Sequence, residues 1–209
     1  MPARFVPGAA GSVRSAAMSP VDPVPYRIAG IAGSLRRASF NKSLLAHAAA
    51  VAPPSLAIDV LPDALRLPLF DQDLEDAGDP DEVVALRAAL AEADGLLLVT
   101  PEYNFGVPGP VKNMVDWMSR PPGRAPLRDK PVLLMGASTG RLGGTVQAQG
   151  QLRISLAVVG AHVMASPPVL VAEAGTRFDG DVLVDEPTQK IVALALARFA
   201  DFVATHRPR

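Results

Sequence analysis

The residues of this chain best suited to chemistry form a short polar loop after a run of four apolar residues, 96–99. The loop combines a carboxylate, an amide and two aromatic rings in the sequence Pro101, Glu102, Tyr103, Asn104 and Phe105. Backbone N–H groups in such a loop can bind the heteroatoms of a flat polar ring, while aromatic side chains supply apolar surface. Two alternatives remain open, namely that the loop is only a connection and that Glu102 is a solvated carboxylate.

A second loop, residues 33–43, carries side chains that suit a phosphate group. It lies between an expected strand and an expected helix, where unpaired N–H groups and the helix dipole favour an anion. Its donors are Ser34, Arg36, Ser39 and Asn41. Because the loop lacks both the P-loop pattern and G-x-G-x-x-G, it indicates a phosphate monoester rather than a dinucleotide. The alternative is that Ser39 only caps the helix and that Arg36 and Arg37 are solvated.

A third loop, residues 136–144, is rich in glycine, which lets a backbone approach a ligand closely. Ser138, Thr139, Gly140 and Arg141 lie in it. The two hydroxyl groups can donate hydrogen bonds, and the guanidinium suits a ring edge or a second anion. Alternatively, the last two glycines of the loop simply form the turn into the next helix.

Strand and helix patterns alternate from Tyr26 to the end of the chain. Apolar runs predict strands over residues 26–32, 57–61, 96–99, 132–135 and 162–165, with the last one extending as far as residue 171 in a longer interpretation. Helices are expected from Phe40, from Asp79 as N-cap, from about Val111, after Gly144 and from Asp185. The buried side of the last helix is predicted to contain Ile191, Leu194, Ala195, Phe199 and Phe202.

This alternation predicts an α/β fold with three layers, in which a five-stranded parallel sheet has helices on both faces. A flavodoxin-like strand order, 2-1-3-4-5, makes the ends of strands one, three and four neighbours, so that the three loops meet. A phosphate at one end of the shared site and a polar ring at the other describe a mononucleotide. With this strand order, the mononucleotide we expect is FMN.

Composition limits the classes of function. The 209 residues are 49% hydrophobic, which fits one domain over residues 26–209. We expect the N-terminal extension, residues 1–25, to be disordered. An alternative is that the natural protein starts at Met18. The net charge of −1 provides no basic surface for nucleic acid or for a membrane. The chain has no cysteine and only three widely spaced histidines, so no metal site is expected. Without an apolar run of about 20 residues, a cytoplasmic protein is expected.

The three loops together resemble those of the NAD(P)H-dependent FMN reductases, which include azoreductases, quinone reductases and chromate reductases. The resemblance covers residues 26 to about 170. It rests on the pattern Gly33-Ser34-x-Arg36-x-x-Ser39-x-Asn41, on Pro101-Glu102-Tyr103-Asn104, on Pro108-Gly109-x-x-Lys112-Asn113-x-x-Asp116-Trp117 and on the glycine-rich third loop. The N-terminal extension and the pair Pro110-Val111 depart from the usual pattern.

The resemblance implies a flavodoxin-like fold, tightly bound FMN, NAD(P)H as co-substrate and a homodimer or dimer of dimers with the flavin near the subunit interface. It assigns the phosphate of FMN to the donors of the first loop, from Ser34 to Asn41. The isoalloxazine ring is assigned to residues 101–104 and 138–141. The second half of the central block, Lys112, Asn113, Asp116 and Trp117, is implied to be structural or interfacial.

The leading hypothesis is a two-step, ping-pong reaction. NAD(P)H gives a hydride to N5 of FMN and leaves, and a small-molecule acceptor then takes the electrons; quinones, azo compounds, nitro compounds, flavins and metal oxyanions are the candidates. Because the flavin carries this chemistry, no side chain is assigned as a catalytic residue. The alternatives are a flavodoxin-like electron carrier and a flavin-binding regulatory protein, neither of which turns over nicotinamide.

Overall fold

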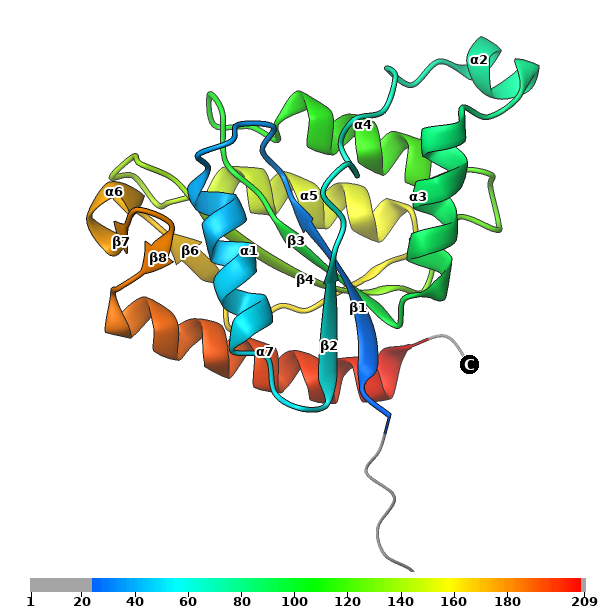
Figure 1. The fold of residues 1–209 in the computed structure, drawn as a ribbon. Coiled ribbons are helices and arrows are strands. Elements are labelled where there is room, and N and C mark those ends of the chain that lie inside the picture. The colour runs from blue at the N-terminus through cyan, green and yellow to red at the C-terminus, as the bar shows by residue number, and fades with distance from the viewer. Residues whose placement is uncertain (1–23, 208–209) are drawn as a thin grey trace, which may run out of the picture.

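The centre of the fold is a parallel sheet with helices on both faces (Figure 1). The computed structural model describes residues 24–207, so the extension predicted for residues 1–25 lies outside the described residues apart from its last two. Neighbouring strands are all parallel, and their order confirms the predicted 2-1-3-4-5. In that order the strands are β2 (Leu56–Val60), β1 (Tyr26–Ala32), β3 (Gly95–Val99), β4 (Pro131–Ala137) and β5 (His162–Val163).

Two short strands share the last position of the sheet. The strand β5 pairs with the beginning of β4, and β6 (Val169–Val171) pairs with its end. The single strand expected over residues 162–165 or 162–171 is therefore wrong in extent. Pro167 and Pro168 lie in the gap, where they have no N–H group to donate to a ladder. In the same gap, Arg153 donates to the carbonyl of Met164 at 2.8 Å.

One face of the sheet is covered by α1 (Phe40–Ala50) and α7 (Glu186–His206). The buried side of α7 differs from the prediction, since Leu194 is 46% exposed and Ile191 and Phe202 are only partly buried. Phe199 lies over Gly95, where a Cβ atom would come within 3.1 Å of its ring. The residues that α7 buries are Val192, Ala195, Leu196, Phe199, Ala200 and Val203.

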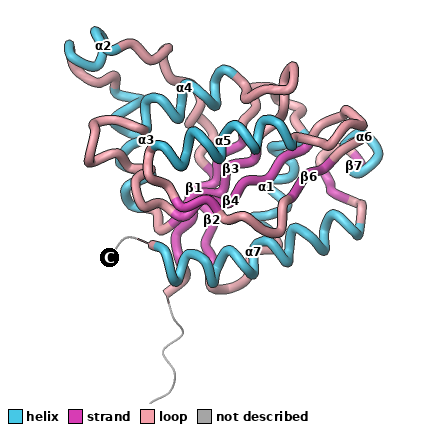
Figure 2. Tube along the Cα trace, turned by 180° about the vertical axis from the view of Figure 1, so that it is seen from behind, coloured by secondary structure: helices cyan, strands magenta, loops and turns pink. Residues whose placement is uncertain are grey.

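The other face of the sheet is covered by α3 (Asp81–Glu92), α4 (Gly109–Met118) and α5 (Val146–Val158), as Figure 2 shows from behind. The helix α3 begins at Asp81, with Pro80 at its N-cap position. The predicted cap by Asp79 is wrong, because the carboxylate of Asp79 pairs with Arg87 instead.

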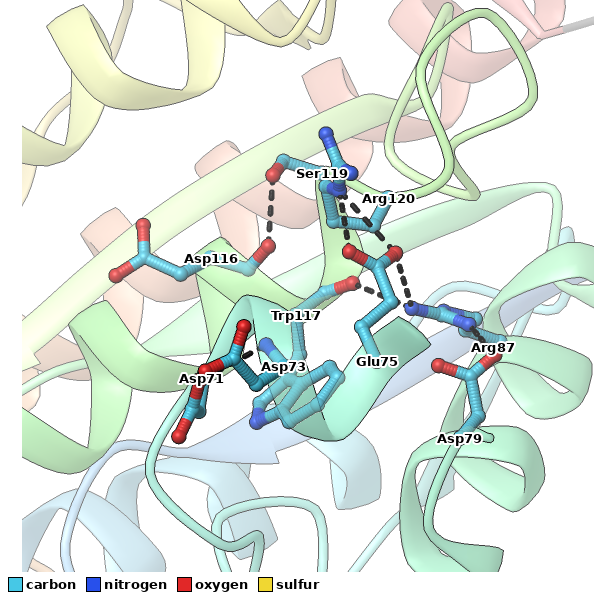
Figure 3. A network of polar contacts seen from close by, with 9 residues as sticks. All are labelled: Asp71, Asp73, Glu75, Asp79, Arg87, Asp116, Trp117, Ser119 and Arg120. Carbon is cyan, nitrogen blue, oxygen red and sulfur yellow. Dashed lines mark hydrogen bonds and ion pairs between the residues drawn. The ribbon is translucent and has the colours of Figure 1, made fainter. Parts of the chain in front are cut away.

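A short helix that was not predicted, α2 (Gln72–Ala77), stands out from the body of the molecule (Figure 1). None of its residues is buried. Figure 3 shows how it is held by charge: Glu75 accepts from Nε of Arg120 at 2.8 Å and lies 3.8 Å from Arg87, which also pairs with Asp79. Ion pairs, rather than apolar burial, therefore hold α2 against the rest of the protein.

The segment before α2 is fixed by side chains of α4. The indole Nε1 of Trp117 and the amide Nδ2 of Asn113 both donate to the carbonyl of Pro68 at 2.8 Å. The amide oxygen of Asn113 accepts from the N–H of Phe70 at 2.7 Å. These contacts make Asn113 and Trp117 structural, whereas Lys112 and Asp116 pair with each other on the surface of α4.

Three further small elements follow β6 and were not predicted. They are α6 (Ala174–Arg177) and the hairpin of β7 (Phe178–Asp179) and β8 (Val182–Leu183). The hairpin lies against α1, where the hydroxyl of Ser43 donates to Asp181 at 3.0 Å. Within residues 24–207, no helix has both the length and the apolar character that crossing a membrane requires.

Candidate functional site

The three predicted loops follow β1, β3 and β4, which are neighbours in the sheet, and they meet around two adjoining cavities. The first, which we call the loop cavity, measures about 170 Å³. The second, the side cavity, measures about 320 Å³ and shares Glu102 and Ser138 with the first. The loop cavity is lined by Ser34, Arg36, Ser39, Phe40, Asn41, Pro101, Glu102, Tyr103, Ala137, Ser138 and Thr139. The side cavity is lined by Glu102, Asn104, Phe105, Ser138, Gly140, Arg141, Leu142 and Gly144.

Every predicted site residue therefore lines one of these two cavities. A larger hollow of about 630 Å³ lies between residues 61–66 and α3, and none of the three loops contributes to it. Polar donors from separate loops converge only at the smaller pair among these three hollows. Chemistry rather than size thus locates the candidate site.

The first loop offers donors that are not used by the fold. Ser39 is the N-cap of α1, yet its buried hydroxyl makes no capping hydrogen bond. Arg36 lines the loop cavity with an exposed side chain, and its guanidinium forms no ion pair with another residue in 24–207. A hydroxyl, a guanidinium and the first turn of a helix together form a suitable set of donors for a phosphate group.

Asn41 has a different role from its neighbours in this loop. Its amide nitrogen donates to the carbonyl of Ala137, and its amide oxygen accepts from the N–H of Ala137, both at 2.9 Å. Asn41 is buried and lines the loop cavity, but both ends of its side chain are engaged by β4. Its side chain joins the first loop to the third, and its backbone N–H and the second N–H of its amide nitrogen remain as donors for an anion.

The central loop ends in a tight turn. Tyr103 and Gly106 exchange two backbone hydrogen bonds, at 3.2 and 3.0 Å. Between them, Asn104 and Phe105 have positive φ angles of 51° and 58°. Asparagine tolerates this left-handed conformation, whereas for phenylalanine it is strained. The turn nevertheless presents the ring of Phe105 to the side cavity, with 63% of the residue exposed.

Glu102 binds the protein itself. One oxygen of its carboxylate accepts from the N–H groups of Gln147 and Ala148, at 2.8 and 2.9 Å. These groups lie in the first turn of α5, whose N-cap residue, Thr145, makes no side-chain cap of its own. Glu102 thus caps α5 from the neighbouring loop, and a negative charge is favourable at that end of a helix. The alternative that Glu102 is merely solvated is wrong.

The third loop is braced from two sides. The hydroxyl of Ser138 accepts from the N–H of Gly140 at 3.1 Å, and Arg141 pairs with Glu173 at 3.3 Å. At Gly136 a Cβ atom would lie 2.2 Å from the hydroxyl of Thr145, so only glycine fits between β4 and the beginning of α5. The sequence placed Gly136 at the start of the third loop, whereas in the structure it lies inside β4.

Besides the lining residues Phe40, Ala137, Leu142 and Gly144, sequence reasoning missed Gln151 of α5, which supports the central loop. Its amide nitrogen donates to the carbonyl of Phe105 at 3.0 Å, and its amide oxygen accepts from the N–H of Val107 at 3.3 Å. Nothing in the sequence distinguishes it from any other exposed glutamine on a helix, because the contact joins segments far apart in the chain.

The residues present fit FMN. The loop cavity has unused donors at the end formed by the first loop, and Tyr103 of the central loop and Ser138 and Thr139 of the third loop line the rest of it. Serine hydroxyls and a guanidinium suit a phosphate dianion, and an aromatic side chain beside hydroxyl donors suits a flat heterocycle. Contact between the individual residues and FMN stays a prediction.

Comparisons with known proteins agree with this geometry. The sequence model of a family described as NADPH-dependent FMN reductase matches residues 26–176. An NAD(P)H-dependent FMN reductase of Pseudomonas aeruginosa is 38% identical over 79% of this chain and 89% of its own length. A 2-hydroxy-1,4-benzoquinone reductase of a Burkholderia species is 38% identical over 87% of this chain and 98% of its own.

A solved structure gives the same result. It is FerB, a flavoenzyme NAD(P)H:(acceptor) oxidoreductase of Paracoccus denitrificans, with a TM-score of 0.79 and 31% identity, and the match covers 88% of this chain and 100% of the other. The resemblance to this family, inferred from the three loops, is confirmed. The chain is therefore an oxidoreductase that belongs to the NADPH-dependent FMN reductase family, with FMN as its cofactor and NAD(P)H as its co-substrate.

Proposed function

We propose that this protein transfers electrons from NAD(P)H to quinones through FMN whose phosphate binds in the loop cavity and whose ring lies where the two cavities adjoin. The observation that carries the proposal is the pair of adjoining cavities that share Glu102 and Ser138. One has the donors for a flavin nucleotide, and the other is a neighbouring space with apolar walls at Phe105 and Leu142. The name of the Burkholderia relative, a benzoquinone reductase, supports a quinone as the acceptor.

The residues of the chain have binding and orienting roles in this proposal. Arg36 and Ser39 hold the phosphate, and the backbone of the central and third loops orients the ring. When bound, FMN supplies the chemistry, because it accepts a hydride at N5 and returns two electrons. The protein adds N–H donors around the ring, which stabilise negative charge as it develops. No acid or base from the chain is required at this stage.

We also propose a ping-pong order, in which the nicotinamide and the acceptor use the side cavity one after the other. If NAD(P)H and the acceptor both use the space beside Phe105 and Arg141, they must bind in turn. Initial rates measured over a grid of NADPH and 1,4-benzoquinone concentrations test this order. We expect parallel lines in the double-reciprocal plot, whereas lines that converge would mean that both substrates bind together. Azo compounds, nitro compounds, free flavin and metal oxyanions are further acceptors for the same assay.

We also infer a homodimer, either alone or within a dimer of dimers. Three exposed apolar residues of α5, Val146, Ile154 and Val158, lie on one side of the helix together with Gly150, at spacings of four or eight residues. Exposed apolar side chains in one row on a helix are a common feature of protein interfaces. The row begins beside the side cavity, so a second copy on α5 would lie next to the flavin. The use of NAD(P)H supports a cytoplasmic location.

A further inference from the structure

The turn that carries Phe105 is joined to α5 by four hydrogen bonds of one kind, each between a side chain and a backbone group. Glu102 accepts from two N–H groups of α5, at 2.8 and 2.9 Å. One turn further along that helix, Gln151 donates to the carbonyl of Phe105 and accepts from the N–H of Val107. Glu102 of the central loop therefore binds the first turn of α5, and Gln151 of α5 binds the tip of the loop. We call these two side chains the clamp.

The clamp acts on a strained backbone. Phe105 has a φ angle of 58°, a conformation that a bulky residue adopts only where neighbouring contacts hold it. The ring of Phe105 gains little burial in return, because 63% of the residue is exposed. Burial of the ring within one protomer thus does not account for its position. In the strained turn, Phe105 forms one wall of the side cavity, beside Leu142 and Arg141.

We propose that Glu102 and Gln151 are positioning residues that hold Phe105 as a wall of the acceptor site, and that this wall selects flat aromatic acceptors. The inference rests on the proposed function, because it gives the side cavity to the acceptor. A flat ring can stack on Phe105 over its whole face, whereas a compact octahedral anion such as ferricyanide touches only its edge. Discrimination between these two shapes is therefore the property that the clamp controls.

The test compares two acceptors in the FMN-loaded enzyme, 1,4-naphthoquinone and ferricyanide. Phe105→Ala is expected to raise KM for the quinone about three- to tenfold relative to KM for ferricyanide. Phe105→Tyr keeps an aromatic ring, so the ratio of the two KM values should stay close to that of the wild type. Gln151→Ala keeps the Phe105 side chain but removes two hydrogen bonds that support its turn. The ratio of the two KM values should therefore change in the same direction, by a smaller factor. Gln72→Ala provides the matched control, since it alters an exposed helical glutamine of α2 that lines neither cavity.

Hydrogen exchange provides a readout that does not depend on turnover. In Gln151→Ala, the backbone amides of residues 103–107 should exchange about tenfold faster than in the wild type, because the turn has lost two of its supports. Phe105→Ala should not accelerate that exchange. Unchanged exchange in Gln151→Ala, or equal changes of KM for both acceptors in Phe105→Ala, would overturn the inference. Failure of NADPH to reduce the wild-type flavin would instead defeat the proposed function.

Discussion

Asn41 and Ala137 exchange two hydrogen bonds of 2.9 Å across the floor of the loop cavity, although they are 96 residues apart in the chain. Both residues are buried. One lies in the first turn of α1 and the other at the end of β4. The loop with the phosphate donors and the loop that follows β4 are thus fixed to each other before any ligand binds, which reduces the ordering that ligand binding would otherwise require.

Replacing Asn41 tests this connection. Asn41→Ala should lower the free energy of unfolding by about 2–4 kcal/mol, because two hydrogen bonds are lost and the N–H and carbonyl of Ala137 remain buried without partners. FMN affinity should fall as well, since the two loops are no longer held together. Urea unfolding and flavin fluorescence titration measure the two effects. A variant with wild-type stability would show that the pair carries little energy.

Arg36 is predicted to bind the phosphate of FMN and nothing else of the ligand. Arg36→Ala should weaken FMN binding about 10- to 100-fold, the usual value of a charge-assisted hydrogen bond, and should leave riboflavin binding unchanged. Arg37→Ala is the matched control, because Arg37 is exposed in the same loop and lines neither cavity. Equal losses for FMN and riboflavin would indicate damage to the loop rather than loss of a phosphate contact.

The N-cap of α7 gives a prediction for pH. The carboxylate of Asp185 accepts from the hydroxyl and the N–H of Thr188, at 2.6 and 3.0 Å, and it pairs with Arg177. The hydrogen bond from the Thr188 hydroxyl, with help from Arg177, holds the pKa of Asp185 below its usual value despite partial burial. A lowered folded-state pKa stabilises the fold above the unfolded pKa, and this stabilisation is lost as the pH falls through the folded value.

Asp185→Asn isolates that effect, because asparagine also caps helices but does not titrate in this range. We expect the wild type to be more stable than the variant at pH 7, by about 1 kcal/mol, and this difference to shrink as the pH falls below the unfolded pKa of about 4. Urea unfolding between pH 7 and pH 3 measures it. A difference that stays constant with pH would mean that the charge of Asp185 contributes nothing.

The exposed row on α5 predicts the oligomeric state. Ile154 and Val158 are 68% and 82% exposed, so charging both should not disturb the fold of one protomer. If the row is an interface, Ile154→Asp with Val158→Asp should convert the dimer into monomers in sedimentation velocity. Val182→Asp, an equally exposed valine on the β7–β8 hairpin, should leave the dimer intact. A wild type that sediments as a monomer would refute the proposed dimer.

Much of the fold follows from the sequence because local patterns determined it. The apolar run ending at Val99 could only be a strand buried on both faces, and β3 is buried throughout. Asp79 failed as a predicted cap because its carboxylate pairs with Arg87, eight residues further along the chain in α3. The apolar face of α7 was predicted one residue out of place, since the apolar pattern of this helix does not show which of two neighbouring rows faces the sheet.

The sequence predicted which loops form the candidate site, but it did not predict the contacts that their residues make. Residue types identified Arg36 and Ser39 as donors because their chemistry is local. The roles of Glu102 and Asn41 depend on partners in α5 and in β4, 45 and 96 residues away. Gln151 left no signal at all, because a glutamine that supports a distant turn looks like one that faces water.

The most direct test of the central claim is the visible spectrum of the FMN-loaded protein during anaerobic addition of NADPH or NADH. The account predicts a flavin spectrum that bleaches rapidly with at least one of the two nucleotides and recovers when 1,4-benzoquinone is added. A flavin that stays oxidised with both nucleotides would contradict the reductase and favour an electron carrier or a regulatory flavoprotein. A protein that cannot be loaded with FMN would contradict the assignment of the loop cavity itself.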